Sequence, residues 1–263
     1  MTEELIGYAA SILIGVVLGL LGGGGSILSI PILVYLFGVD PVIASGYSLF
    51  IVGMTSLAGA IPKYRRQLVN LRTGILFGIP SIVTTFFTRL LIVPAIPEVV
   101  IQLGDVEVTK RMLILGVFAV LMVLASIPMI RGKGEVTSEN KRFRIVLVLL
   151  EGTVIGFLTG LVGAGGGFLI IPALVFLTGL RFKTAVGTSL FIIAINSLTG
   201  FAGDLVNHEM DWVLLLTITS LAVFGILIGN RLSSRIPGTQ LRMAFGWFTL
   251  ATGGFIIFRE LGN

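Results

Sequence analysis

The stretch that decides the fold is GLLGGGGSILSIP, residues 19–31, which returns as GLVGAGGGFLIIP at residues 160–172. Each copy closes an apolar segment of helical length with glycines and continues into a short apolar segment carrying Pro31 or Pro172. Glycine runs disfavour a continuous helix, so the backbone is predicted to break twice at the same point. In a membrane, backbone groups released from a helix are tolerated only where protein buries them or they line a wet cavity. The two breaks are therefore the first candidates for a functional site.

The composition is that of an integral membrane protein. Of the 263 residues, 55% are hydrophobic and 12% are charged, and the mean hydropathy is +1.06. Soluble domains carry about 25% charged residues. Apolar runs of about 16 to 20 residues between charged loops predict membrane-crossing helices rather than barrel strands. The acidic start, Thr2-Glu3-Glu4, does not resemble the basic start of a signal peptide, so the first helix is expected to be retained.

The chain is an internal duplication. An offset of 141 residues aligns the two glycine stretches and holds without a gap for about forty residues, with roughly half of the positions identical. Ser48 to Ile51, for example, match Ser189 to Ile192. We expect a first transmembrane repeat over residues 1–133 and a second over residues 134–263, intertwined in one transport domain.

Each repeat contains five apolar segments. In the first repeat these are residues 5–21, 26–37, 41–61, 73–93 and 112–130. In the second they are residues 145–162, 167–177, 184–203, 212–229 and 243–258. The second segment of each set, 12 or so residues, reaches only about 18 Å as a helix, too short to cross the hydrocarbon alone. The first two segments are either two crossings or one re-entrant hairpin, and either choice returns the chain to its starting side.

The loop charges indicate that the second repeat is inserted upside down. The loop after the third segment is basic in the first repeat, with Lys63, Arg65 and Arg66, and acidic in the second, with Asp204 and Asp211. Placing both termini outside puts 14 of the 18 Lys and Arg residues on the cytoplasmic side. The predicted fold class is thus an all-α, polytopic membrane protein with two inverted-topology repeats and broken or re-entrant helices at the glycine turns. Inverted repeats are a transporter architecture, with sites near the midplane where the copies meet.

The two glycine breaks are predicted to hold a single anion between them, near the membrane midplane. Unpaired N–H groups and the positive end of the dipole lie at the start of the short second helix, and glycine lets a ligand approach the backbone closely. The predicted substrate-binding residues here are Gly23, Gly24, Gly25, Ser26 and Ile27 in the first repeat and Gly165, Gly166, Gly167 and Phe168 in the second. The alternative is that glycine only allows close helix packing, as separated residues such as Gly15 and Gly19 would.

The third segments supply a second matched set of polar residues, whose hydroxyl and amide groups suit a desolvated oxyanion. Tyr47-Ser48 matches Thr188-Ser189, and Asn196 follows within the second of these segments. All five residues are predicted to bind substrate. The alternative for the serine and threonine hydroxyls is a hydrogen bond to their own helix backbone.

Few charged residues lie within the apolar segments. Glu151 is a candidate for carrying a coupling proton; alternatively it pairs with Arg144 or Lys141. Arg89 is expected to snorkel to the membrane surface, and His208 to be solvated in an outer loop. With no cysteine and no Asp, Glu and His cluster, the sequence predicts no metal, no cofactor and no catalytic triad.

The glycine motifs, each followed by a polar stretch at 46–50 or 187–191, resemble the TauE/SafE sulfite exporter family (TSUP-type membrane transporters) over nearly the whole chain. The resemblance implies a prokaryotic plasma-membrane transporter of sulfur-containing anions such as sulfite, sulfonates or sulfoacetate, suspected of proton coupling. The first repeat departs from the family's Gly-Thr-Ser pattern, because Tyr47 follows Gly46.

The residue patterns and the family resemblance both predict a multi-pass secondary transporter that exports small anions by alternating access. The protein is not expected to be an enzyme. The partners expected are a small anionic substrate, the lipid bilayer and protons, and no nucleic acid. The alternatives are an anion channel, which would share the site but need a continuous pore, or an uptake carrier for another oxyanion or a carboxylate.

Overall fold

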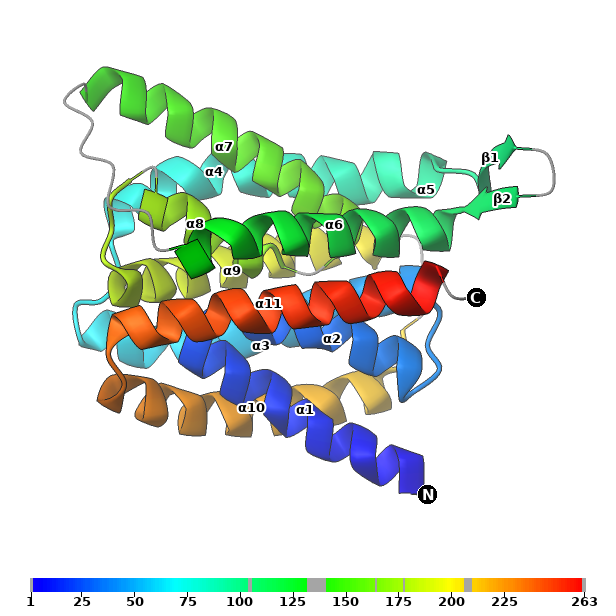
Figure 1. Cartoon of the computed structure of the whole chain (residues 1–263), viewed down its shortest axis with the longest axis horizontal. Coiled ribbons are helices and arrows are strands. Elements are labelled where there is room, and N and C mark those ends of the chain that lie inside the picture. Colours follow the sequence, from blue (N-terminus) through cyan, green and yellow to red (C-terminus); the bar gives the residue numbers. More distant parts are fainter. Residues whose placement is uncertain are drawn as a thin grey trace.

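The computed structural model describes residues 2–103, 106–131, 141–163, 165–176, 178–205 and 210–261, and it is a helical bundle with one β-hairpin (Figure 1). The main helices of the first repeat are α1 (Thr2–Leu21), α2 (Gly24–Tyr35), α3 (Pro41–Arg65), α4 (Leu71–Phe87) and α6 (Lys110–Arg131). Those of the second are α7 (Lys141–Val162), α8 (Gly167–Phe176), α9 (Phe182–Asp204), α10 (Trp212–Arg235) and α11 (Gly238–Leu261). The polytopic α-helical fold class is confirmed.

Seven helices in the described part of the chain are long and apolar enough to cross a membrane. They cover residues 41–65, 71–95, 112–131, 145–162, 182–204, 212–235 and 238–258. Large apolar side chains on their outer faces are exposed, among them Phe87, Leu124, Leu150, Val213 and Phe258. In a soluble protein such a surface would be unusual, whereas here lipid covers it.

The short helix α2 turns back beside α1. Tyr8 and Phe37 stack edge to face with ring centroids 5.5 Å apart, so the start of α1 and the end of α2 lie together. At 12 residues, α2 is about 18 Å long, too short to cross alone. Together α1 and α2 form a helical hairpin with the glycine break at its tip, the arrangement that the re-entrant alternative predicts.

The two ends of the bundle differ in charge. Both termini and the β-hairpin lie at one end, which we call the terminal end (Figure 1). The ends of α3, α6 and α10 and the starts of α4, α9 and α11 lie at the other, the basic end (Figure 1). The basic end carries Lys63, Arg65, Arg66, Arg72, Arg131, Arg181, Lys183, Arg231, Arg235 and Arg242. The linker 132–140 and His208 lie outside the described residues.

Each main helix pairing has a counterpart in the other repeat. The most extensive contacts join α1 to α10, α4 to α7, α3 to α9 and α6 to α11. Glycines form the seams of the first two pairs, because a Cβ on Gly15 would lie 1.8 Å from the Ala222 carbonyl oxygen, and one on Gly156 would lie 2.5 Å from the Ser81 carbonyl oxygen. Each of these positions lies 141 residues from its counterpart. The separated glycines therefore serve close helix packing, as the sequence indicated for Gly15 and Gly19.

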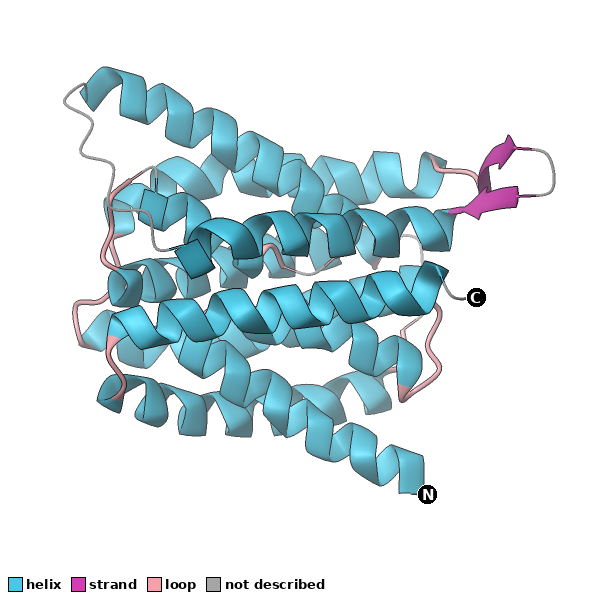
Figure 2. Ribbon diagram, viewed as in Figure 1, coloured by secondary structure: helices cyan, strands magenta, loops and turns pink. Residues whose placement is uncertain are grey.

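The region between α4 and α6 holds features that the hydropathy pattern did not reveal. After α4 the helix widens into the π-helix η1 (Thr88–Ile92), followed by the short α5 (Val93–Ala95). Pro94 lacks the N–H of a regular helical turn, which accounts for the disruption. Strands β1 (Val99–Leu103) and β2 (Val106–Thr109) then pair antiparallel, in a segment read from sequence as a loop (Figure 2).

Candidate functional site

The two glycine breaks touch each other in the interior. A Cβ on Gly23 would lie 2.4 Å from both the carbonyl carbon and oxygen of Gly167, and one on Gly167 would lie 2.7 Å from the Cα of Gly23. Contact at this distance is open only to glycine, since carbon atoms pack at about 3.5 to 4.0 Å. The helices α2 and α8 begin here, so the positive ends of two helix dipoles, roughly half a charge each, point to one region.

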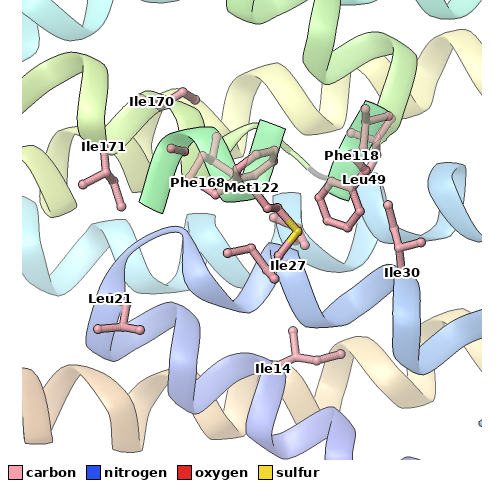
Figure 3. Packing of buried hydrophobic residues seen from close by; sticks show 14 of the residues in the cluster. Ile14, Leu21, Ile27, Ile30, Leu49, Phe118, Met122, Phe168, Ile170 and Ile171 are labelled. Atoms are coloured by element: carbon pink, nitrogen blue, oxygen red, sulfur yellow. The ribbon is translucent and has the colours of Figure 1, made fainter. Parts of the chain in front are cut away.

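The first break is lined by apolar side chains, backbone groups and one hydroxyl that is already bonded. A Cβ on Gly22 would meet Val186, and one on Gly25 would meet the Ile14 carbonyl oxygen and Leu18. The Ser189 hydroxyl donates to the Gly22 carbonyl. The side chains of Ile27 and Phe168, which follow the two breaks, lie in the hydrophobic core with Phe118 and Met122 (Figure 3). Ile27 and Phe168 can therefore contribute only backbone groups to an anion site. Gly24 lies in the first turn of α2, and the side chain of Ser26 lies outside the described residues.

The second break is lined by polar groups. Gly163, Gly165 and Gly166 all have positive φ angles, of 79°, 65° and 68°. An added Cβ would lie 2.1 Å from Arg89 Nη2 at Gly163, 2.8 Å from Ser197 Oγ at Gly165, and 2.1 Å from Thr159 Oγ1 at Gly166. We call Arg89, Thr159 and Ser197 the second-turn cluster. None of these three atoms has a hydrogen-bond partner among the described residues, although all are buried.

Such an arrangement is costly without a ligand. A buried donor left without an acceptor costs about 1 to 3 kcal/mol, and native proteins contain few of them. Here the three groups converge on one turn, next to the start of α8. Each of the three groups packs against a different glycine of this turn and has an unused hydrogen-bond donor.

Arg89 does not snorkel, which corrects the expectation from sequence. It is a fully buried side chain on η1, 1% exposed. Its Nη1 donates to Ser45 Oγ at 2.9 Å and to Asp204 Oδ2 at 3.2 Å, whereas Nε and Nη2 have no partner among the described residues. Asp204, read from sequence as a loop residue, is the buried last residue of α9. A buried charge needs a partner, and the pairing of these two residues meets that need.

The predicted serines of α3 and α9 both contact the first hairpin, formed by α1 and α2. Ser48 Oγ shares a hydrogen bond of 2.5 Å with Ser29 Oγ on α2. Ser189 Oγ donates to the Gly22 carbonyl at 3.2 Å and to the Val186 carbonyl at 2.9 Å. Both hydroxyls are buried and tie the third helices to neighbouring elements.

Tyr47 and Thr188 lie away from the breaks. The Tyr47 hydroxyl accepts a hydrogen bond from the N–H of Asp211 at 2.6 Å, and Thr188 Oγ1 accepts one from the N–H of Asn70 at 2.9 Å. Asp211 and Asn70 are the N-caps of α10 and α4. Tyr47 and Thr188 therefore bind the N-caps of equivalent helices, one in each repeat.

Asn196 and Glu151 each retain unused hydrogen-bonding capacity. Asn196 Nδ2 donates to Ser81 Oγ at 3.0 Å, whereas its Oδ1 has no partner among the described residues. Glu151 is half-buried on α7, and its buried Oε2 also has no described partner. The side chains of Lys141 and Arg144 lie outside the described residues, so their pairing with Glu151 is not tested.

Three residues near the second break, Arg89, Asp204 and Thr159, were not predicted as site residues from sequence; Arg89 was expected at the membrane surface and Asp204 in a loop. A cation within an apolar segment is a functional candidate by default, and that signal was available for Arg89. Nothing local marks Thr159 or Asp204, because their significance depends on what packs against them.

The fold and this site define the class: a polytopic α-helical membrane protein whose two broken-helix hairpins meet in the interior beside unpaired polar groups. The chain belongs to the TauE/SafE sulfite exporter family, because the family model described as sulfite exporter TauE/SafE matches residues 7–256.

Relatives span the whole chain. A probable membrane transporter protein of Xylella fastidiosa is 30% identical over 255 residues, covering 94% of this chain and 92% of its own. The probable membrane transporter protein YdhB of Bacillus subtilis is 27% identical, covering 93% and 96%. No solved structure matches the chain. The family and these relatives are membrane transporters by name.

Proposed function

We propose that the protein is a secondary transporter that exports small sulfur-containing anions, such as sulfite or sulfonates, across a prokaryotic plasma membrane by alternating access. The observation that carries this proposal is the second-turn cluster. Three buried side-chain atoms in it, Arg89 Nη2, Thr159 Oγ1 and Ser197 Oγ, have no hydrogen-bond partner among the described residues and pack against a glycine turn at the start of α8. Hydroxyl and guanidinium donors match the oxygen atoms of an oxyanion, and the family description supplies the sulfur chemistry.

The substrate is proposed to sit at the second break, within reach of the N–H groups of Gly165 to Phe168. The first break would contribute mainly the dipole of α2, because the hydroxyl that reaches it, Ser189 Oγ, is already bonded to the Gly22 and Val186 carbonyls. Asn196 and Ser197 are neighbours on α9, and each has a side-chain atom without a described partner. Asn196 therefore extends the proposed site toward α4.

Binding and flux test this function directly. Purified protein should gain thermal stability with sulfite, thiosulfate or a sulfonate, because a ligand bound by the folded state stabilises it. Proteoliposomes should show saturable uptake and countertransport. Ser197→Ala should weaken binding about tenfold, the loss of roughly one hydrogen bond of 0.5 to 1.5 kcal/mol. Thr199→Ala is the matched control, since its exposed hydroxyl bonds only the Ile195 carbonyl. Single-channel currents would indicate a channel instead, and full affinity in Ser197→Ala would exclude this site.

The repeats are proposed to be inverted, with the basic end in the cytoplasm and both termini outside. The reciprocal pairing of α1 with α10 and α4 with α7 supports a pseudo-two-fold axis, and the charge of the basic end supports the orientation.

Thiol labelling of intact cells tests the orientation, because the chain has no native cysteine. A cysteine replacing exposed Glu98 should react with a membrane-impermeant reagent. One replacing exposed Thr239 at the basic end should react only after the cells are opened. The reverse pattern would refute the proposed orientation.

Glu151 is proposed to carry the coupling proton, on the basis of its half-buried position in an apolar helix with an unpaired oxygen. Glu151→Gln should then remove the acceleration of transport by a proton gradient and leave substrate affinity within about twofold. Counterflow, which needs no gradient, is the control. Gradient-dependent transport of normal size in the variant would rule this role out.

A further inference from the structure

The charge of Arg89 is paired with Asp204, but its hydrogen-bonding capacity is only partly used. Its guanidinium carries five N–H donors, of which only those of Nη1 have described acceptors, on Ser45 and Asp204. The N–H groups of Nε and Nη2 remain without described partners in the interior. The contact with Asp204 is also one-sided, since Nη1 reaches Oδ2 at 3.2 Å and Oδ1 only at 3.5 Å. Two parallel N–H bonds, the strong arrangement for Arg and carboxylate, are not formed.

The unused nitrogen Nη2 faces the second glycine break. Gly163 lies so close to it that an added Cβ would be 2.1 Å away. Asp204 contacts the guanidinium at the other terminal nitrogen, Nη1. Arg89 therefore contacts both a resident carboxylate on α9 and the glycine turn at which an oxyanion is proposed to bind.

The matching position of the other repeat has no such pair. An offset of 141 residues aligns Arg89 with Asn230 and Asp204 with Lys63. Lys63 Nζ donates to Ser233 Oγ at 2.7 Å, and Asn230 Nδ2 donates to the Gly59 carbonyl at 3.1 Å. Both residues line a cavity of about 270 Å³ at the basic end that also contains Arg66 and Arg231 and no carboxylate. An anion would be attracted to this end, whereas the Arg89 end holds its own counter-ion.

We propose that Asp204 is a built-in competitor for the substrate: the transported anion binds Arg89 through its free Nε and Nη2 edge and displaces the Asp204 carboxylate from Nη1. This inference rests on the proposed function and specifies how its site recognises charge. The Asp204 pair closes the terminal end of the path when no substrate is bound. The buried guanidinium keeps an anionic partner throughout the exchange, and the cost of losing the ion pair falls on the displaced Asp204 carboxylate, which opposes substrate binding.

The test is sulfite binding to the purified full-length protein, with Arg89→Gln and Asp204→Asn measured side by side. Arg89→Gln should weaken binding at least about a hundredfold. Asp204→Asn should tighten binding about tenfold or more, because the competitor is gone and the ligand then neutralises an otherwise unpaired cation. Turnover in proteoliposomes should nevertheless fall in Asp204→Asn, since release becomes slow. Arg89→Lys, which keeps the charge but not the planar edge, should bind with intermediate affinity.

Sulfite affinity should change in opposite directions in the two variants, and this distinguishes the proposal from a purely structural ion pair, whose loss would weaken binding in both. If both variants weaken sulfite binding equally, or leave it unchanged, the competition is refuted. This conclusion holds even if wild-type protein binds sulfite and Ser197→Ala weakens that binding, because the proposed function would then stand. If wild-type protein binds no anion of the panel, the proposed function itself fails. Should either single variant not fold, the double variant Arg89→Gln/Asp204→Asn removes both charges with little change in shape. It should fold and lose sulfite binding, and wild-type affinity in it would overturn the inference.

Discussion

Gly23→Ala is expected to abolish transport while the protein is still inserted and monodisperse. The φ of Gly23 is −156°, so a left-handed backbone conformation is not the reason for glycine at this position. Its Cβ would lie 2.4 Å from the carbonyl of Gly167, and the two hairpin tips must separate by about 1 Å to relieve this contact. A displacement of that size at a binding site reduces rates about a hundredfold, and we expect a loss of at least that size in proteoliposome flux.

The matched control is Gly116→Ala on α6, where an added Cβ meets nothing within 4 Å. This variant should transport at the wild-type rate and be slightly more stable, because alanine favours a helix over glycine by up to about 1 kcal/mol. Sulfite binding by Gly23→Ala should be lost together with flux. Wild-type flux in folded Gly23→Ala would mean that the contact between the hairpin tips has no part in transport.

Gly15→Val is expected to cause the largest loss of stability. The added Cβ would lie 1.8 Å from the carbonyl oxygen of Ala222 and 2.7 Å from the N–H nitrogen of Ile226. Both neighbours are backbone atoms of α10, so no side chain can rotate away and the whole helix must shift. Overpacking costs about 1 to 3 kcal/mol and occasionally more. At about 2 to 4 °C per kcal/mol for a chain of this size, we expect the apparent melting temperature to fall by about 6 °C or more.

Gly156 occupies the equivalent position between α7 and α4, and Gly156→Val should destabilise the protein for the same reason. Gly254→Val is the control, because this residue of α11 is exposed and has open space around it. Melting curves followed by intrinsic fluorescence in one detergent would give all three values. A melting temperature for Gly15→Val equal to that of the control would show that α1 and α10 do not pack as closely as described.

The fold was largely predictable because the membrane limits the choice of structure. Apolar runs had to be helices, and the duplicated glycine stretches located the two breaks to within a few residues, at α1–α2 and α7–α8. What was missed lay between α4 and α6: the π-helix at Thr88 and the β-hairpin leave no hydropathy signal, since they depend on Pro94 and on strand pairing. The length of α9 was also underestimated, because Asp204 looks like a loop residue until its partner is seen.

The candidate site was predictable in its backbone and much less so in its side chains. The glycine breaks were chosen correctly as the place where the hairpins meet, since only glycine allows that contact. Tyr47 and Thr188 were selected as ligands because they are polar and matched, yet they hold the N-caps of α10 and α4. Thr159 escaped notice because a threonine in a membrane helix most often bonds its own backbone, and only the turn at Gly166 shows that this one does not.

The sequence by itself determined that this protein lies in a membrane, is duplicated and has two helix breaks, because hydropathy, self-similarity and glycine conformational preference are properties of short segments. Only the tertiary structure decided that α1 and α2 fold back as one hairpin, that the two breaks touch, and that buried polar atoms without a described hydrogen-bond partner gather at the second break. These features join residues more than a hundred positions apart, such as Gly23 with Gly167 and Arg89 with Asp204. Burial of Arg89 depends on a carboxylate that only α9 brings to it, and no local pattern of residues encodes that meeting.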